Sequence, residues 1–165
     1  MAARKAKDQT AITPRRKSAG VLLYRRAGDG VELLIVHPGG PFWAKRDEGA
    51  WSIPKGEYAE DEDPLEAAKR EFVEELGKLP RGAITALGEI RQKAGKVVTA
   101  FALEGDFDCA TFKCNSFEIE WPPKSGKRAS FPEIDQAQWF SLEEARRRIN
   151  PAQAELIGRL EEELA

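Results

Sequence analysis

The chain has 165 residues, of which 41% are hydrophobic and 33% charged, and its formal net charge is -2. This length suits one domain with a substantial core. The near-balanced charge argues against a dedicated nucleic-acid-binding protein, whose affinity comes mainly from neutralising phosphates. The apolar runs are far shorter than a membrane span, so no membrane association is expected.

The N-terminal residues 1–16 are polar and basic and show no periodicity. We expect a flexible basic tail there, followed by a single domain over residues 17–165. No apolar segment follows the basic residues, which excludes a secretory signal. Cys109 and Cys114 have no histidine near them and are too few for a structural zinc site. We interpret them as ordinary thiols in a reducing compartment and expect a cytoplasmic protein.

A β-hairpin is predicted at the start of the domain, with strands over Val21–Arg25 and Val31–His37 and a glycine-containing turn between them. Pro38–Ala50 follows as a loop rich in glycine and proline. After Trp51–Ile53, Pro54-Lys55-Gly56 interrupts the apolar pattern.

A helix is predicted over Asp63–Leu76. Asp63 is a good N-cap, Pro64 suits the first helical position, and Gly77 is a typical residue for the C-terminal end. Leu65, Ala68, Phe72 and Leu76 recur every three or four residues, which indicates one face packed on a core.

The second half of the chain is predicted to contain four strands and two helices, with one basic loop. The strands lie at Ala83–Gln92, Val97–Glu104, Ser116–Trp121 and Gln136–Phe140, the loop at Pro122–Pro132, and the helices at Leu142–Ile149 and Ala152–Leu164. Strands and helices are mixed without regular alternation, so the fold class is α+β. The last helix has an apolar face suited to packing or to a dimer interface, so we expect a monomer or a homodimer.

Three carboxylates gather on a second face of the predicted helix. Glu71, Glu74 and Glu75 stand at positions i, i+3 and i+4, where like charges destabilise an isolated helix by roughly 0.2–0.5 kcal/mol per pair. Arg70 offsets part of this through its i+4 pairing with Glu74. Oxygen ligands in this arrangement favour a hard divalent cation such as Mg²⁺, with Mn²⁺ as a substitute. A solvated acidic face is the alternative interpretation.

The residues before and within the helix decide between these interpretations. They follow the pattern G-x5-E-x7-R-E-U-x-E-E-x-G-U, where U is a bulky aliphatic residue, at Gly56, Glu62, Arg70, Glu71, Glu74, Glu75 and Gly77. This pattern resembles the Nudix box, and the resemblance extends over most of Lys17–Ile149. Phe72 and Lys78 depart from the aliphatic positions, which concern packing. The resemblance implies a Nudix-type α/β/α sandwich with a mixed β-sheet.

The Nudix resemblance also implies roles for individual residues. The metal ligands would be Glu71, Glu74 and Glu75, together with the Gly56 carbonyl, and Arg70 would orient the carboxylates. Nudix enzymes often add a carboxylate from a distant loop. Glu133 is similarly placed, and Asp135 is its rival.

The implied activity is Mg²⁺-dependent hydrolysis of a phosphoanhydride bond, with water activated by the metal. Pro54-Lys55-Gly56 resembles the branch that acts on dinucleoside polyphosphates, such as diadenosine tetraphosphate, or on diphosphoinositol polyphosphates. Lys55 would contact the phosphate chain. ADP-ribose and nucleoside triphosphates stay open as substrates, and so does a nucleotide-sensing module that binds without turnover.

The loop Pro38–Ala50 is the expected specificity element for a small nucleotide or polyphosphate ligand. Trp43 or Phe42 would stack on a base, and Lys45 and Arg46 would contact phosphates. The alternative is that the aromatic side chains only cover the domain itself.

Overall fold

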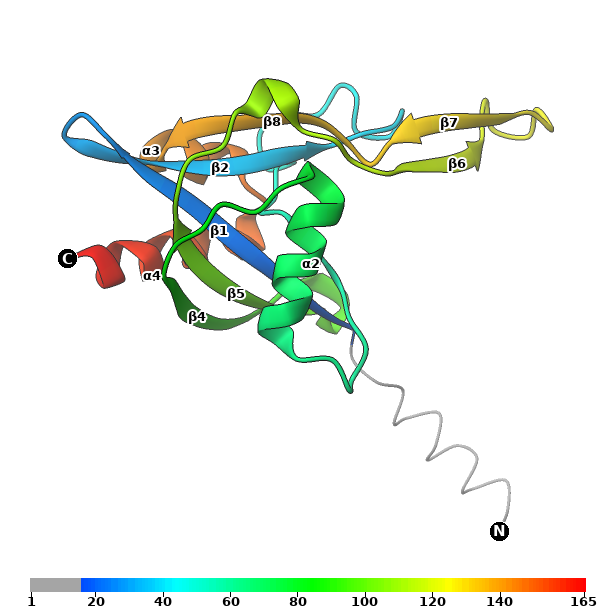
Figure 1. Ribbon diagram of the computed structural model, residues 1–165. Coiled ribbons are helices and arrows are strands. Elements are labelled where there is room, and N and C mark those ends of the chain that lie inside the picture. The colour runs from blue at the N-terminus through cyan, green and yellow to red at the C-terminus, as the bar shows by residue number, and fades with distance from the viewer. Residues whose placement is uncertain (1–15) are drawn as a thin grey trace, which may run out of the picture.

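The computed structural model describes residues 16–165, and it forms a sheet with helices on both faces (Figure 1). The expected tail over residues 1–16 lies outside the described residues except for Arg16. The helices are α2 (Pro64–Leu76), α3 (Leu142–Arg148) and α4 (Ala154–Leu164). A side chain caps the N-terminus of α2 and of α3, and α4 packs through its buried apolar residues. Short 3₁₀ turns are η1 (Lys93–Gly95), η2 (Cys109–Thr111) and η3 (Pro151–Gln153).

The main sheet has six strands in the order β4-β5-β1-β2-β8, and β3 pairs with β1 off this path. Their bounds are β1 (Lys17–Ala27), β2 (Gly30–Pro38), β3 (Lys55–Glu57), β4 (Ile84–Arg91), β5 (Val97–Glu104) and β8 (Ile134–Ser141). β1 runs parallel to β5, whereas β1–β2, β1–β3, β2–β8 and β4–β5 are antiparallel. The sheet is therefore mixed, as expected.

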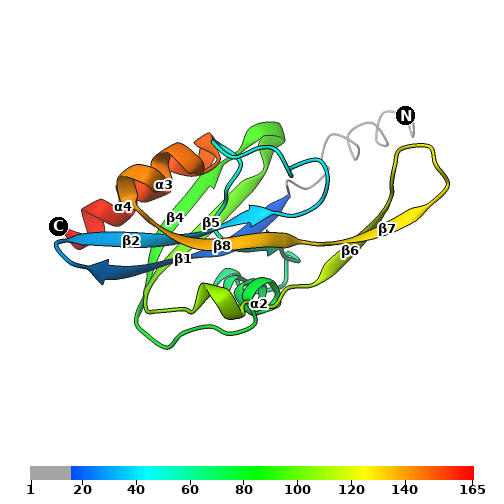
Figure 2. The same cartoon turned by 90° about the horizontal axis from the view of Figure 1, so that it is seen from above.

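The central strand β1 is apolar on both faces, and this requires two covering layers. Val21 and Leu23 pack in one core cluster with Phe72 of α2. Leu22, on the opposite face, packs in a second cluster with Leu156 of α4. Figure 2 shows α2 on one side of the sheet and α3 and α4 on the other. The expected α/β/α sandwich is confirmed.

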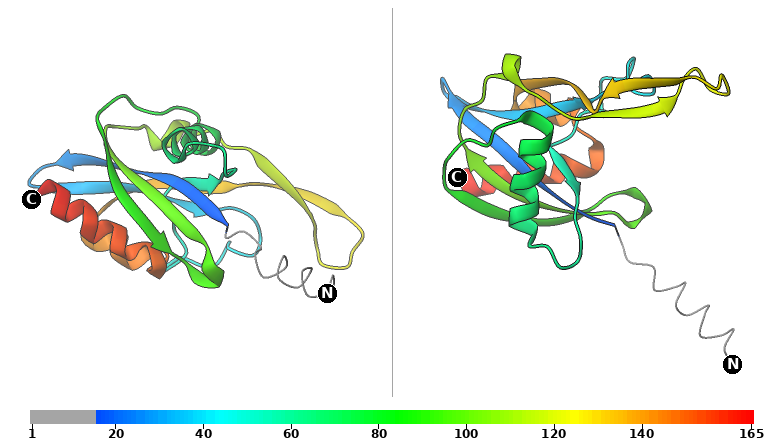
Figure 3. Two further views of the ribbon diagram at one scale, coloured as in Figure 1. Left: turned by 90° about the horizontal axis from the view of Figure 1, so that it is seen from below. Right: turned by 45° about the vertical axis from the view of Figure 1, so that its right-hand side comes forward.

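The arm, defined as residues 116–132, is a second, two-stranded sheet that projects beyond the sandwich (Figure 3). It consists of β6 (Ser116–Glu120) and β7 (Arg128–Pro132), paired antiparallel. The prediction of a loop over the whole of Pro122–Pro132 was therefore wrong. β7 has few apolar residues and ends in proline, so its pattern alone does not indicate a strand. It is stabilised by its ladder with β6, which brings Phe131 opposite Phe117.

A second difference concerns Pro54-Lys55-Gly56, where an interruption was expected. Lys55–Glu57 instead forms β3, with Gly56 opposite Ala19 of β1. Gly20 makes this approach possible, because a Cβ there would lie 2.6 Å from the Pro54 carbonyl oxygen. Within residues 16–165, the helices are too short or too polar to cross a membrane.

Candidate metal and phosphate site

Helix α2 carries the site, and its ends lie where the sequence predicts them. The Asp63 side chain accepts a hydrogen bond from the Glu66 N–H, and Gly77 ends the helix in a left-handed conformation with φ of 97°. Its buried residues are Ala67, Ala68, Phe72 and Leu76. This face fixes the rotation of the helix, so the acidic residues lie on the side that faces β3 or solvent.

Gly56 and Glu71 are in close contact. A Cβ built on Gly56 would lie 2.0 Å from Glu71 Oε2 and 2.1 Å from its Cδ. Only glycine leaves room for this carboxylate against the backbone of β3. The Glu71 side chain is 12% exposed, and burial together with the charge of Glu74 raises its pKa.

Arg70 binds three carboxylates of the site. Its Nε and Nη2 donate to the two oxygens of Glu62 at 2.9 and 3.0 Å, a bidentate pair. Its Nη1 donates to Glu71 Oε1 at 2.8 Å and to Glu74 Oε1 at 3.1 Å. Arg70 therefore holds Glu71 and Glu74 side by side and lowers their mutual repulsion.

Glu75 lies deeper than the other two acids. Its Oε1 accepts a hydrogen bond from the backbone N–H of Lys55 at 3.1 Å. Burial, followed by the charge of Glu71, raises the pKa of Glu75 to about 8. Burial lowers the pKa of the neighbouring Lys55. A buried carboxylate beside another one is costly unless a cation neutralises it.

A cavity of about 180 Å³ lies next to these carboxylates and contains both Glu75 and Glu133. Lys55 lines it as well, and its remaining walls are Val36, Pro38, Ser52, Ile53 and Ile134. Asp135, the rival of Glu133, is the extra residue of a β-bulge between β2 and β8, and its Oδ1 lies 2.7 Å from His37 Nδ1. The structure therefore places Glu133, and not Asp135, in the cavity with Glu75.

The donor set fits a hard divalent cation in kind, because it offers carboxylate oxygens on one helix face and a glycine-lined recess. In the arrangement described, Glu71 and Glu74 are bound by Arg70, and Glu75 by the Lys55 amide. Among residues 16–165, no three His, Cys, Asp or Glu side chains converge closely enough to hold a metal. A metal ion would therefore compete with Arg70 for Glu71 and Glu74.

The NUDIX domain family model matches residues 14–160, nearly the whole chain. The chain belongs to the Nudix family. A curated relative, the RNA pyrophosphohydrolase of Bartonella henselae, is 27% identical over 79% of this chain and 78% of its own length. The RNA pyrophosphohydrolase of Helicobacter pylori strain G27 is 40% identical over 34% of this chain and 41% of its own length. The expectation of a Nudix enzyme is confirmed at the level of the family and its hydrolase class.

Solved Nudix structures share the fold of this chain. The Nudix domain of Shewanella oneidensis NrtR, solved with ADP ribose, has a TM-score of 0.66 at 18% identity and covers 99% of this chain and 98% of its own. An Ap4A hydrolase of C. elegans in a binary complex has a TM-score of 0.61 at 21% identity, with 90% and 97% covered. At these identities the likeness establishes the fold and leaves the substrate of this Nudix protein open.

The loop residues predicted to bind substrate lie apart from this cavity. Lys45 and Arg46 line a polar pocket of about 260 Å³ with His37, Gln136 and Arg148. Val36 and His37 are adjacent on β2, so their side chains point to opposite faces of the sheet. Val36 lines the cavity of Glu75, whereas His37 lines the polar pocket. Lys55 alone among the predicted substrate-binding residues shares the cavity of Glu75.

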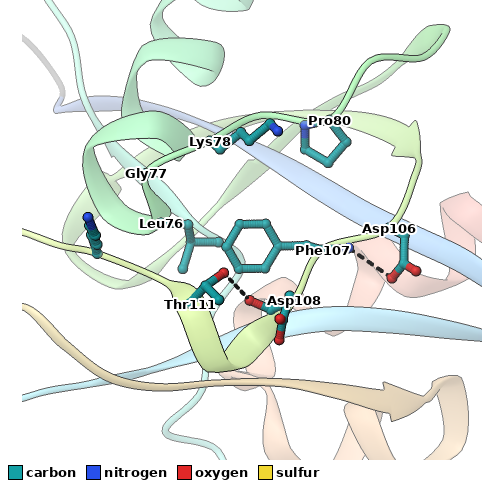
Figure 4. A pocket seen from close by; sticks show the side chains of 9 residues that line it. Leu76, Gly77, Lys78, Pro80, Asp106, Phe107, Asp108 and Thr111 are labelled. Atoms are coloured by element: carbon teal, nitrogen blue, oxygen red, sulfur yellow. Dashed lines mark hydrogen bonds between the residues drawn. The ribbon is translucent and has the colours of Figure 1, made fainter.

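A cavity of about 430 Å³ lies at the C-terminal end of α2, and none of the Nudix box carboxylates lines it. Phe107 lies beside Leu76 at its floor (Figure 4). Asp106 pairs with Arg25 and accepts the Phe107 N–H, while Asp108 accepts the Ala110 N–H. These contacts give both aspartates a structural role.

Gln153 is a positioning residue that the sequence did not reveal. Its side chain is fully buried. Its Oε1 accepts the Ile53 N–H at 3.0 Å, and its Nε2 donates to Ser52 Oγ at 3.0 Å and to Gln92 Oε1 at 3.2 Å. Gln153 thereby fixes the segment that leads into β3. It lies about 100 residues away from that segment in the chain, and no local pattern marks it.

His37 attaches the loop Pro38–Ala50 to the sheet. Its Nε2 donates to the Arg46 carbonyl at 2.6 Å, its Nδ1 lies 2.7 Å from Asp135 Oδ1, and its ring packs edge-on against Trp51.

We expect His37→Phe, which keeps a ring but removes both polar contacts, to lower the free energy of unfolding by about 1–3 kcal/mol. Urea unfolding followed by tryptophan fluorescence measures the change. Gln138→Ala, an exposed change in the same pocket, should stay within about 0.5 kcal/mol of the parent. If His37→Phe had the same free energy of unfolding as the parent, the two polar contacts of His37 would add nothing to stability.

Proposed function

We propose that this Nudix protein hydrolyses a phosphoanhydride bond in a dinucleoside polyphosphate such as diadenosine tetraphosphate. The observation that carries the proposal is the cavity in which Lys55, Glu75 and Glu133 meet, directly beside the Gly56–Glu71 contact. A cation and two carboxylates around one small cavity suit a phosphate chain bound together with divalent metal. The free thiols of Cys109 and Cys114 support a cytoplasmic location.

In this proposal Glu71, Glu74 and Glu75, with the Gly56 carbonyl, hold Mg²⁺, and Mn²⁺ serves as a substitute. When bound, the metal would neutralise phosphate charge and lower the pKa of the attacking water. Arg70 keeps Glu71 and Glu74 on one side of the helix. Lys55 positions the phosphate chain in the cavity, and Glu133, which is exposed at the same cavity, accepts the proton of the water.

The 5′ end of RNA is a second candidate substrate. Relatives from Bartonella henselae and Helicobacter pylori carry the name RNA pyrophosphohydrolase. Both substrates contain a nucleoside 5′-polyphosphate that is linked to at least one further nucleoside or nucleotide. This applies to a 5′-triphosphorylated RNA and to a dinucleoside polyphosphate, so the same cavity suits both.

A substrate panel tests these proposals. Diadenosine polyphosphates, nucleoside triphosphates, ADP-ribose, diphosphoinositol phosphates and 5′-triphosphorylated RNA are each incubated with Mg²⁺, with Mn²⁺ and with a chelator. We expect metal-dependent release of a nucleotide or phosphate product from a 5′-polyphosphate, and no release with the chelator. Tight binding without turnover of any compound would instead support a nucleotide sensor.

A further inference from the structure

The arm and the loop Pro38–Ala50 are joined next to Glu133. The Gly39 N–H donates to the Glu133 carbonyl at 2.8 Å, and a Cβ on Gly39 would lie 2.0 Å from the Pro132 carbonyl oxygen. Gly40 has a φ of 95°, and a Cβ there would lie 2.7 Å from the ring of Phe117. Two adjacent glycines therefore let the loop lie directly on the base of the arm, where β7 leads into the cavity of Glu75.

Aromatic side chains are exposed where these two segments meet. Phe42 is 63% exposed and Trp43 is 39% exposed. The ring of Phe42 stands edge-on to that of Trp121 on the arm, at 5.6 Å between centroids, and the Arg46 guanidinium lies 5.5 Å from the Trp43 centroid. A contiguous exposed apolar patch marks an interaction site or a ligand-binding groove.

The charged groups around these rings leave a surplus of positive charge, although Glu120 on the arm, which accepts the Gly126 N–H, offsets one of the lysines. Asp47, Glu48 and Glu118 are each paired, with Arg148, Arg147 and Arg128 respectively. Within the described part of the chain, no carboxylate lies within 4.0 Å of the cationic groups of Lys45, Arg46, Lys124 and Lys127.

The tip of the arm has a defined turn. The Ser125 N–H donates to the Pro122 carbonyl, and the Gly126 N–H to the Glu120 carboxylate. Lys124 and Lys127 are therefore presented on an ordered turn.

We propose that the arm and the loop Pro38–Ala50 together form a stacking platform for single-stranded RNA, whose 5′-polyphosphate enters the cavity of Lys55, Glu75 and Glu133. Unpaired bases stack on Phe42, Trp43 and Trp121, and the lysines of the tip contact the backbone phosphates. The overall charge of -2 is compatible with this, because the positive charge is local. The inference rests on the proposed hydrolysis of a 5′-polyphosphate.

Direct binding tests the platform without any need for catalysis. Fluorescence anisotropy with a labelled single-stranded hexaribonucleotide lacking the triphosphate should show that Phe42→Ala weakens binding about tenfold. Lys124→Asn with Lys127→Gln should weaken it further at low salt, and asparagine tolerates the φ of 60° at position 124. A blunt RNA duplex should bind more weakly than the single strand. Equal binding of the hexamer by the parent and by Phe42→Ala overturns the inference.

Two controls make the result specific. Lys78→Gln with Arg81→Gln removes two exposed cations between α2 and β4, outside both the arm and the loop Pro38–Ala50, and should leave hexamer binding unchanged. Phe42→Leu keeps apolar volume without an aromatic face, so it should behave like Phe42→Ala. If Phe42→Ala instead turns a dimer into a monomer in sedimentation while hexamer binding is retained, the surface is an interface between copies and the RNA platform is wrong.

Kinetics separates this inference from the proposed function. With 5′-triphosphorylated RNAs of one to six nucleotides, the parent should gain kcat/KM with length, and Phe42→Ala should lose about tenfold of that gain. Failure of the parent to hydrolyse any 5′-polyphosphate would refute the proposed function. The comparison of hexamer binding by the parent and by Phe42→Ala would still test the platform. A rate independent of RNA length, with hydrolysis intact, would overturn the platform alone.

Discussion

Replacing Glu74 by glutamine should lower kcat/KM by about 1,000-fold with almost no loss of stability. Loss of one anionic metal ligand removes several kcal/mol of transition-state stabilisation, and about 4 kcal/mol corresponds to this factor. The Glu74 side chain is 42% exposed and pairs with Arg70, which keeps its bidentate pair with Glu62. The free energy of unfolding should therefore stay within about 0.5 kcal/mol of the parent.

Glu66→Gln is the matched control for Glu74→Gln. It makes the same chemical change on α2, at an exposed side chain that pairs with Lys69. It should leave both kcat/KM and the Mg²⁺ dependence unchanged. Steady-state rates across a Mg²⁺ titration compare the two variants, and urea unfolding checks that both are folded. Wild-type activity of Glu74→Gln at low Mg²⁺ would refute the assignment of Glu74 as a metal ligand.

Local chemistry made α2 the most predictable part of the site. The N-cap, the proline at the first turn, the glycine at the end and the apolar period all act within a few residues, and they fixed both the helix and the face on which the glutamates lie. The i+4 pairing of Arg70 with Glu74 was confirmed at 3.1 Å for the same reason. Its bidentate contact with Glu62 brings in the preceding loop, which spacing alone does not place.

The contacts between distant segments could not be predicted in the same way. The recess at Gly56 depends on β3 pairing with β1, and Gln153 reaches Ser52 and Ile53 across about 100 residues. β7 is a strand because β6 lies beside it. In each case the stabilising partner lies outside the segment itself, so the pattern of that segment alone did not indicate the contact.

The loop Pro38–Ala50 shows how composition can suggest a role without giving a position. Its aromatic and basic residues indicated a ligand-binding loop, and the structure gives them different neighbours. Phe42 lies beside the arm, whereas Lys45 and Arg46 line the polar pocket of His37. The predicted substrate contacts of Trp43, Lys45 and Arg46 therefore stay predictions, and in the proposed platform Trp43 would stack on a base.

Gly56→Ala should lower kcat/KM by about 100-fold or more. The added Cβ would lie 2.0 Å from Glu71 Oε2, well inside ordinary contact, so either the carboxylate or β3 must move by about 1 Å. A misplacement of about 1 Å at a catalytic group costs on the order of 100-fold in rate. Overpacking a fixed site also costs about 1–3 kcal/mol of stability. Glu71 itself is unchanged in this variant, so the loss reports the geometry of the recess and not the chemistry of a missing ligand.

Gly158→Ala adds the same methyl group where it has room, and it is the matched control. Gly158 lies inside α4 with no heavy atom within 4 Å of its built Cβ. Alanine there should raise the free energy of unfolding by about 0.5–1 kcal/mol and leave kcat/KM unchanged. Both variants are compared by thermal unfolding and by the Mg²⁺ concentration at half-maximal rate. If Gly56→Ala kept the parent rate and the parent Mg²⁺ dependence, the carboxylate of Glu71 would not need the recess at Gly56, and its place in the metal site would have to be abandoned.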